Sequence, residues 1–186
     1  MSTVRAGSRA RTRQAIIEAA IEVLSRNPAA SLGDVAAAAD VGRTTLHRYF
    51  PERSDLLSAL RTEALDRLEQ ARARARTTED TGSAAVRRLC QEYFDLGDLL
   101  SLLFHEQIAL EDEEDPAGSD AWFEELVQRG HADGTIDPEL PAVWVQSLIW
   151  SQLYVGWSFL AENNPSRHET LRLLLRCVEG AIRPLR

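Results

Sequence analysis

The residues best suited to intermolecular chemistry form a cationic, hydroxyl-bearing run in the first third of the chain. Arginine can pair with guanine in the major groove of DNA, and threonine can meet a thymine methyl group or a phosphate. We interpret Arg43 and Thr44 as candidate base contacts. The other candidates are the phosphate-contacting Thr45, His47, Tyr49 and Arg53, with Arg48 and Ser31 completing the predicted DNA-binding set. Phosphate contacts would fix register on DNA rather than read its sequence.

Charge is divided unevenly along the 186 residues, whose net charge is −8. Residues 1–53 hold eight arginines against five acidic residues and carry +3, whereas the remainder carries −11. Only the N-terminal segment therefore favours a polyanion, and the acidic remainder would be repelled from one.

The elements that must position these side chains are short helices. Apolar spacing predicts a first helix over about 12–26, ended by Asn27 and Pro28. Ser31 is a good N-cap for a second, with Asp34 three residues on. A turn over 40–42 then leads to a third helix over about 43–49. In this arrangement Val35, Val41 and Leu46 pack the helix pair and leave the polar side free, which defines a helix-turn-helix.

A helix pair with a few arginines is more often plain scaffold than a DNA reader, so the motif alone does not decide between these interpretations. The run from Asp34 to Leu57, however, resembles the signature of the TetR/AcrR family of regulators. Its most diagnostic parts are Leu46, the Tyr49–Phe50 pair and Pro51. The resemblance implies an all-α fold, with an N-terminal three-helix DNA-binding domain and a C-terminal helical body for ligand binding and dimerisation. It implies a DNA-binding transcriptional regulator, expected to be a repressor, that a small hydrophobic or aromatic ligand releases from operator DNA.

Three positions depart from the family pattern. Asp40 stands where such turns commonly carry glycine, and Gly42 stands where a serine or threonine usually caps the recognition helix. We expect the turn to survive, because aspartate tolerates the left-handed conformation and glycine is an acceptable N-cap. His47 replaces a common aromatic hydroxyl, and a histidine there can make a phosphate contact depend on pH.

The residues before the first predicted helix are basic. Arg5, Arg9, Arg11 and Arg13 form an arm that is either a solvated tail or, as the resemblance implies, a contact to the DNA backbone or minor groove.

Helical spacing continues through the rest of the chain. Ser54 is expected to cap a fourth helix reaching Arg76, and the polar stretch 77–83 is the expected boundary. We therefore divide the chain into a helix-turn-helix domain (1–53), a connecting helix (54–76) and a ligand-binding and dimerisation domain (77–186). Further helices are expected at about 84–94, 96–110, 119–129, 141–161 and 166–182.

The segment 142–161 has no charged residue and is long enough to cross a bilayer. Glutamines and serines interrupt it and no basic cluster flanks it, so we interpret it as buried between helices rather than in a membrane. Pairing this helix and the last one with their symmetry mates resembles how the family forms homodimers.

Aromatic residues concentrate in the body, where they are usually core. The family resemblance favours a pocket among them for a flat or hydrophobic effector. The candidate lining residues are Phe104, His105, Trp122, Phe123, Trp144, Trp150, Tyr154 and Trp157. Gln107 and Gln152 are candidate polar groups.

Other classes of function find little support. The four histidines are scattered and no nucleophile or phosphate-loop motif is present, so we expect no enzyme, cofactor or metal site. The acidic run 111–115 lacks the spacing of a calcium loop and is interpreted as solvated. Cys90 and Cys177 leave open a thiol-based redox regulator, and a helical adaptor is the other alternative. Without a signal peptide, a cytoplasmic location is expected.

Overall fold

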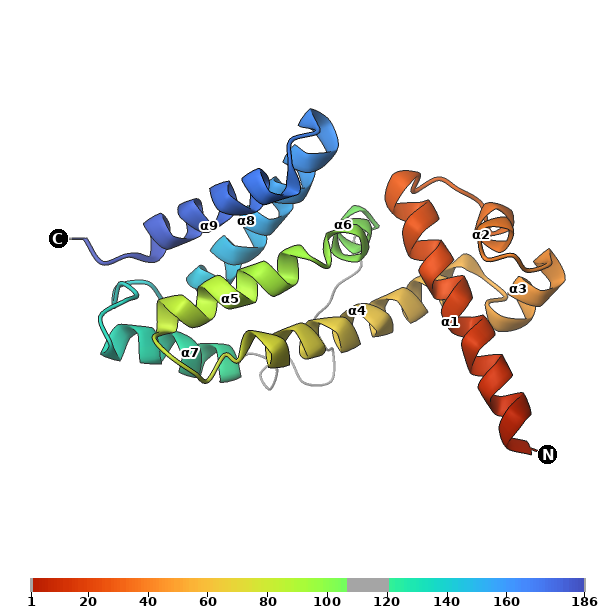
Figure 1. The fold of residues 1–186 in the computed structure, drawn as a ribbon, viewed down its shortest axis with the longest axis horizontal. Helices are drawn as coiled ribbons and strands as arrows, with labels where there is room; N and C mark the ends of the chain where they lie inside the picture. Colours follow the sequence, from red (N-terminus) through yellow and green to blue (C-terminus); the bar gives the residue numbers. More distant parts are fainter. Residues whose placement is uncertain (1, 107–120, 186) are drawn as a thin grey trace. The chain divides into compact units, whose positions relative to one another are not determined.

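The computed structural model describes residues 2–106 and 121–185, and every regular element in these ranges is a helix (Figure 1). The prediction of an all-α fold is confirmed. The helices are α1 Ser2–Arg26, α2 Leu32–Ala38, α3 Arg43–Tyr49, α4 Arg53–Ala75, α5 Gly82–Phe94, α6 Gly97–His105, α7 Ala121–Ala132, α8 Ala142–Asn163 and α9 Arg167–Ile182.

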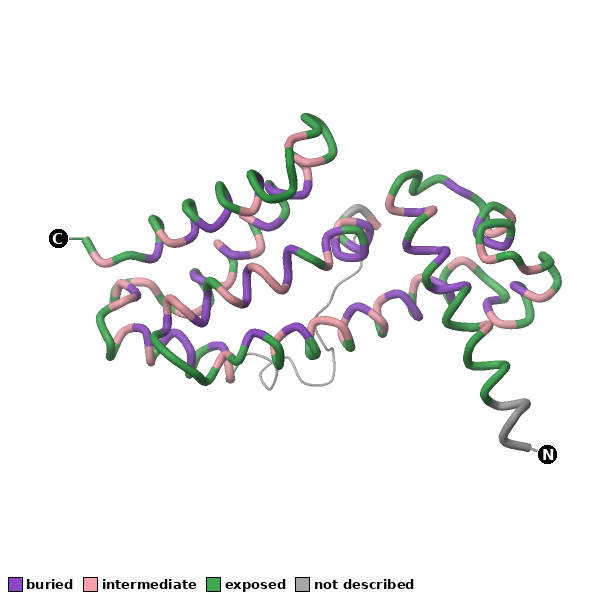
Figure 2. The backbone as a smooth tube through the Cα atoms, in the orientation of Figure 1, coloured by how far each residue is buried: buried purple, intermediate pink, exposed green. Residues whose placement is uncertain are grey.

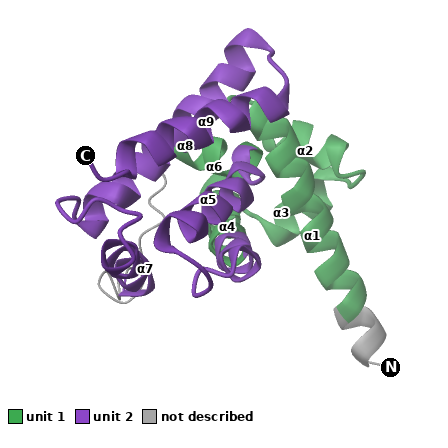
Figure 3. Ribbon diagram, turned by 60° about the vertical axis from the view of Figure 1, so that its left-hand side comes forward, with its two compact units in different colours: residues 1–66, 98–110 green, residues 67–97, 111–186 purple. Residues whose placement is uncertain are grey.

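The chain divides into two compact units (Figure 3). Unit 1 comprises residues 1–66 and 98–110, so it holds α1 to α3, the first part of α4 and nearly all of α6. Its core is mostly aliphatic, and Figure 2 shows buried stretches on each of its helices. Several of the expected helix-packing residues are completely buried. They include Ile17, Leu24, Val35, Leu46 and Leu60. Burial of this stripe holds α2 and α3 against α1, since α2 and α3 have seven residues each and are too short to be stable alone.

Unit 2 comprises residues 67–97 and 111–186. Within it α5 packs against α7, α8 and α9, and α8 also packs against α7 and α9. The side of α8 that faces these neighbours carries Val145, Ile149, Leu153 and Trp157, all buried. Gly156 lets α9 approach, because a Cβ there would lie 3.2 Å from Leu174 Cδ1.

Several helix boundaries differ from expectation. The first helix begins at Ser2 rather than near Thr12, so the basic arm is part of α1. The apolar stripe begins only at Ile16, but arginine and alanine are good helix formers and carry the helix further toward the N-terminus. The fourth helix begins at Arg53, one residue before its expected cap, and its buried face follows Leu56 rather than Leu57.

None of the helices in the described ranges combines the length and the apolarity that a bilayer crossing requires.

Candidate DNA interface and effector-binding body

The entrance to α2 is a complete capping box. The backbone N–H of Asp34 donates to Ser31 Oγ at 3.2 Å, and the backbone N–H of Ser31 donates to Asp34 Oδ2 at 2.8 Å. The hydrogen bonds from Ser31 hold the pKa of Asp34 below its usual value of 3.8. Ser31 thus caps the helix as the sequence predicts, and its predicted DNA contact stays a prediction.

The turn between α2 and α3 has the conformation expected of its residues. Asp40 adopts a positive φ of 53°, the left-handed region that aspartate tolerates. Gly42 is the N-cap of α3, with an extended backbone and no side-chain cap. Its carbonyl accepts the N–H groups of Thr45 at 2.8 Å and Leu46 at 3.0 Å. The backbone alone therefore starts the recognition helix where a capping hydroxyl is absent.

The recognition helix α3 separates buried from exposed residues as predicted. Leu46 is completely buried, whereas the sequence neighbours that carry DNA-binding chemistry are not. Val41, expected to pack with it, is only half-buried. Exposed on α3 are Arg43, Thr44, His47 and Arg48, with Thr45 and Tyr49 half-buried.

The side chain of Arg43 lies along the start of α2. A Cβ added at Gly33 would be 3.1 Å from Arg43 Nε, and the charge of Arg43 contributes to the lowered pKa of Asp34. His47 is also engaged, with Nδ1 3.2 Å from the carbonyl oxygen of Pro51. Both residues are exposed to solvent, and their DNA contacts stay predictions.

Arginines of α1 stack on the aromatic pair at the end of α3. The guanidinium of Arg9 lies 5.8 Å from the ring centre of Tyr49, and that of Arg48 lies 5.6 Å from the same ring. Arg13 lies 5.6 Å from the ring of Phe50. The sequence placed these arginines in an arm ahead of the first helix and left open whether the arm is a solvated tail or a DNA contact. The structure instead makes them a helical flank of α3, because four-residue spacing keeps Arg9 and Arg13 on one face.

Arg53 has a different environment from the other predicted DNA contacts. Its Nη1 donates to the carbonyl of Ala30 at 3.0 Å. Its Nη2 donates to the carbonyl of Pro28 and to Glu106 Oε1, both at 2.7 Å. The sequence offered no signal for this arrangement, since Glu106 is 53 residues away.

Two aromatic pairs in unit 2 involve predicted ligand-binding residues. Trp122 and Phe123 on α7 meet edge to face, with ring centres 5.4 Å apart, and Arg72 lies 4.9 Å above Trp122. Trp150 on α8 stacks on Tyr93 of α5 at 5.5 Å. Tyr93 was missed by the sequence analysis. Burial raises the pKa of its hydroxyl, so it stays protonated and can donate a hydrogen bond.

The other predicted ligand-binding residues are dispersed. Trp157 is buried and serves packing, whereas Trp144 and Tyr154 are exposed on α8. Phe104 is exposed and belongs to unit 1. His105 ends α6, and its side chain lies outside the described residues, as does Gln107. The described ring contacts join Trp122 to Phe123 and Trp150 to Tyr93, and a pocket lined by the predicted set stays a prediction.

One side of α8 and α9 exposes large apolar side chains. Trp144 is 62% exposed and Val155 is 56% exposed. Ser147 and Ser151 on α8 donate their hydroxyls to the carbonyls four residues earlier, so these groups are satisfied within the helix. Further members of this apolar face are Val143, Tyr154, Phe159 and Leu173.

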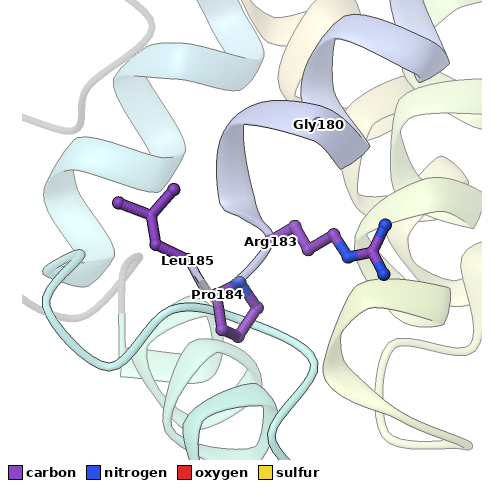
Figure 4. Close-up of a pocket in the computed structure, with 4 residues that line it drawn as sticks. All are labelled: Gly180, Arg183, Pro184 and Leu185. Carbon is purple, nitrogen blue, oxygen red and sulfur yellow. The ribbon is translucent and has the colours of Figure 1, made fainter.

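Two other kinds of site, a surface hollow and a metal site, find less support as binding sites than the aromatic pairs. An open hollow at the end of α9 is lined by Gly180, Arg183, Pro184 and Leu185, and Figure 4 shows Arg183 and Leu185 extending in different directions. It has no aromatic wall for a flat ligand. In the part of the chain that the structure describes, no three potential metal ligands gather, and the acidic run 111–115 lies outside that part.

Known proteins resemble this chain in sequence and in structure along nearly its whole length. Residues 16–60 match the family model of bacterial regulatory proteins, tetR family. The HTH-type transcriptional repressor LfrR of Mycolicibacterium smegmatis is 37% identical over 180 residues, covering 97% of this chain and 95% of LfrR. The crystal structure of the TetR-like regulator LfrR from Mycobacterium smegmatis in complex with proflavine has a TM-score of 0.72 at 35% identity, covering 95% of this chain and 99% of that one. A second crystal structure of LfrR has a TM-score of 0.65 at 32% identity, covering 92% and 99%.

Proposed function

We propose that this chain, which belongs to the tetR family of bacterial regulatory proteins, is a ligand-responsive transcriptional repressor rather than an enzyme. It binds its operator as a homodimer and releases the DNA on binding a planar aromatic effector. The observation that carries the proposal is the division of α3, whose Leu46 is completely buried while its arginines and Thr44 face solvent. An anchored helix with an exposed polar face can enter the major groove without unfolding its core.

In the proposed complex, Arg43 and Thr44 read bases. Thr45, His47, Arg48 and Tyr49 contact phosphates, and Ser31 lies beside them at the start of α2. Arg9 and Arg13 extend this phosphate-binding surface from α1, supported by their stacking on Tyr49 and Phe50. As a regulator that binds DNA, like the similar repressor LfrR, the protein is proposed to act in the cytoplasm.

The experiment is a titration of a fluorescent operator duplex, selected from random-sequence DNA with the wild-type protein. Arg43→Ala should weaken binding by about tenfold or more and relax the preference at one base pair, as expected for a lost bidentate base contact. Arg26→Ala, at the far end of α1, is the matched control because its side chain pairs with Glu22. An equal loss of affinity for all DNA sequences would contradict a base-reading role for Arg43.

The dimer is proposed to form through the apolar face of α8 and α9. Trp144, Val155 and Leu173 are large apolar side chains exposed on these two helices, and such exposure is typical of an interface. A two-fold arrangement would place the two recognition helices on successive major grooves, about 34–36 Å apart. Binding of an effector would then act by changing this separation.

A planar aromatic effector is proposed on two grounds. The relative LfrR was crystallised with proflavine, a flat polycyclic molecule, and unit 2 of this chain holds the Trp122–Phe123 and Tyr93–Trp150 pairs. Flat ligands bind well against aromatic faces. Proflavine should quench tryptophan emission and weaken operator binding in the same concentration range. Operator binding that is unchanged at saturating proflavine would exclude this effector.

A further inference from the structure

The three hydrogen bonds of Arg53 occupy both terminal nitrogens of its guanidinium. Two acceptors are carbonyls of the segment between α1 and α2, and the third is the carboxylate of Glu106. The side chains of Arg53 and Glu106 are only 35% and 21% exposed. A guanidinium in this position is directed into unit 1 rather than toward solvent, unlike the exposed Arg43 and Arg48.

The carbonyls that Arg53 binds lie directly before the helix-turn-helix. Pro28 and Ala30 are followed at once by Ser31, the N-cap of α2. The same segment is closed by a bond from the Ala30 N–H to the carbonyl of Asn27 at 2.9 Å, and Ala30 is buried. Arg53 therefore fixes the position at which α2 begins, and it does so from the first residue of α4.

Glu106 brings α6 into the same cluster. It is the residue after the end of α6, and its N–H donates to the carbonyl of Leu102 at 3.0 Å. Leu102 and Leu103 are buried, so the backbone that carries Glu106 is anchored. Of the three acceptors described above for Arg53, two are carbonyls and one is this carboxylate, and a charge-assisted hydrogen bond is the strongest type available to a guanidinium.

We propose that Arg53 and Glu106 are positioning residues for operator binding. Through Arg53, Glu106 holds the segment before α2 and the start of α4 in the arrangement that presents α3 to DNA. Arg53 accordingly sets operator affinity without touching a phosphate. This proposal depends on operator binding alone and is independent of which effector releases the DNA.

The first test compares Glu106→Gln with wild type on the selected operator duplex. The amide keeps the shape but loses the charge, so operator affinity should fall about twofold to fivefold, as expected for a partly exposed ion pair. Glu22→Gln is the matched control, because it removes an exposed ion pair with Arg26 elsewhere in unit 1 and should leave affinity unchanged. Unchanged or tighter binding by Glu106→Gln would overturn the proposal, since a freed Arg53 would bind phosphate.

The second test uses the salt dependence of binding. The logarithm of affinity falls linearly with the logarithm of salt concentration, and loss of one phosphate contact makes this slope shallower by about 0.9. Arg53→Gln should weaken binding with the slope of wild type, and the double variant with Glu106→Gln should be no weaker than Arg53→Gln alone. A slope reduced by about 0.9, or additive losses, would overturn the proposal. Thermal unfolding checks that each variant folds. If Arg53→Gln does not fold, the Glu106→Gln variant decides the test: weaker operator binding supports the proposal, and unchanged or tighter binding overturns it.

Discussion

The indole N–H of Trp157 donates a hydrogen bond to the carbonyl oxygen of Phe94 at 3.2 Å. The bond ties α8 to the end of α5, and Arg167 of α9 donates to the same carbonyl at 3.1 Å. Gly97, which begins α6, lies against the same indole, since a Cβ there would be 2.7 Å from Trp157 Nε1. Trp157 therefore acts as a packing and hydrogen-bonding residue at the junction of α5 and α6.

This close approach predicts that Gly97→Ala destabilises the protein. The added methyl group must displace a buried ring, and overpacking of this kind costs about 1–3 kcal/mol. Gly180→Ala on α9 is the control, because a Cβ there has nothing within 4 Å. It should be neutral or stabilising by up to about 1 kcal/mol through helix propensity. Chemical denaturation measures both, and equal effects of the two substitutions would contradict the contact.

The capping box predicts a pH-dependent contribution from Asp34. Its pKa is lower in the folded chain than its usual value of 3.8, so its contribution to stability is complete well above pH 3.8 and is lost as the pH falls through the folded pKa. Asp34→Asn should therefore lower the urea midpoint at pH 6, with a smaller difference from wild type near pH 3. A difference that stays constant between these pH values would show that ionisation of Asp34 does not matter. Asp40→Asn is the control, because asparagine keeps the left-handed turn.

The helical position of the basic arm predicts a phosphate role for Arg9. Arg9→Gln should weaken binding to all DNA sequences alike and reduce the salt slope by about 0.9. Arg26→Gln, on the same helix but paired with Glu22, should leave the slope unchanged. If Arg9 only stacks on Tyr49, the affinity of Arg9→Gln can change but the slope will match wild type.

The apolar face of α8 and α9 predicts the effect of a buried charge in a dimer. Val155→Glu should give a monomer in sedimentation velocity and weaken operator binding by about a hundredfold or more, because the second half-site is no longer linked. Leu185→Glu, at a position 92% exposed near the chain end, should remain dimeric. A dimeric Val155→Glu protein would place the interface elsewhere.

The environment of Cys90 predicts an unreactive thiol. Burial raises its pKa to about 12 from an ordinary value of 9.0. In the Cys177→Ser variant, which leaves Cys90 as the one thiol, alkylation at pH 8 should be roughly a thousandfold slower in the folded than in the urea-unfolded protein. Rapid alkylation of the folded variant would favour the thiol-based redox regulator considered from the sequence.

The contrast between Leu46 and Arg53 shows how far sequence reasoning extends. Leu46 was correctly predicted to be buried, since helical spacing over a few residues decides which side of a short helix is apolar. The capping box at Ser31 and the left-handed Asp40 were likewise predictable, because their bonds and backbone preferences are local. The start of α1 was not predictable in this way, since helix propensity extends the helix N-terminal to the first buried apolar residue.

The sequence by itself thus determined the helical class, the helix-turn-helix and its exposed cationic face, all of which depend on neighbours within four or five positions. Only the tertiary structure decided the partners of Arg53, the stacking of Arg9 on Tyr49 and the packing role of Trp157. Those contacts join residues 23 or more positions apart, and no periodicity in the chain specifies which distant groups meet. Their geometry arises when the helices pack and a guanidinium or indole must find an acceptor.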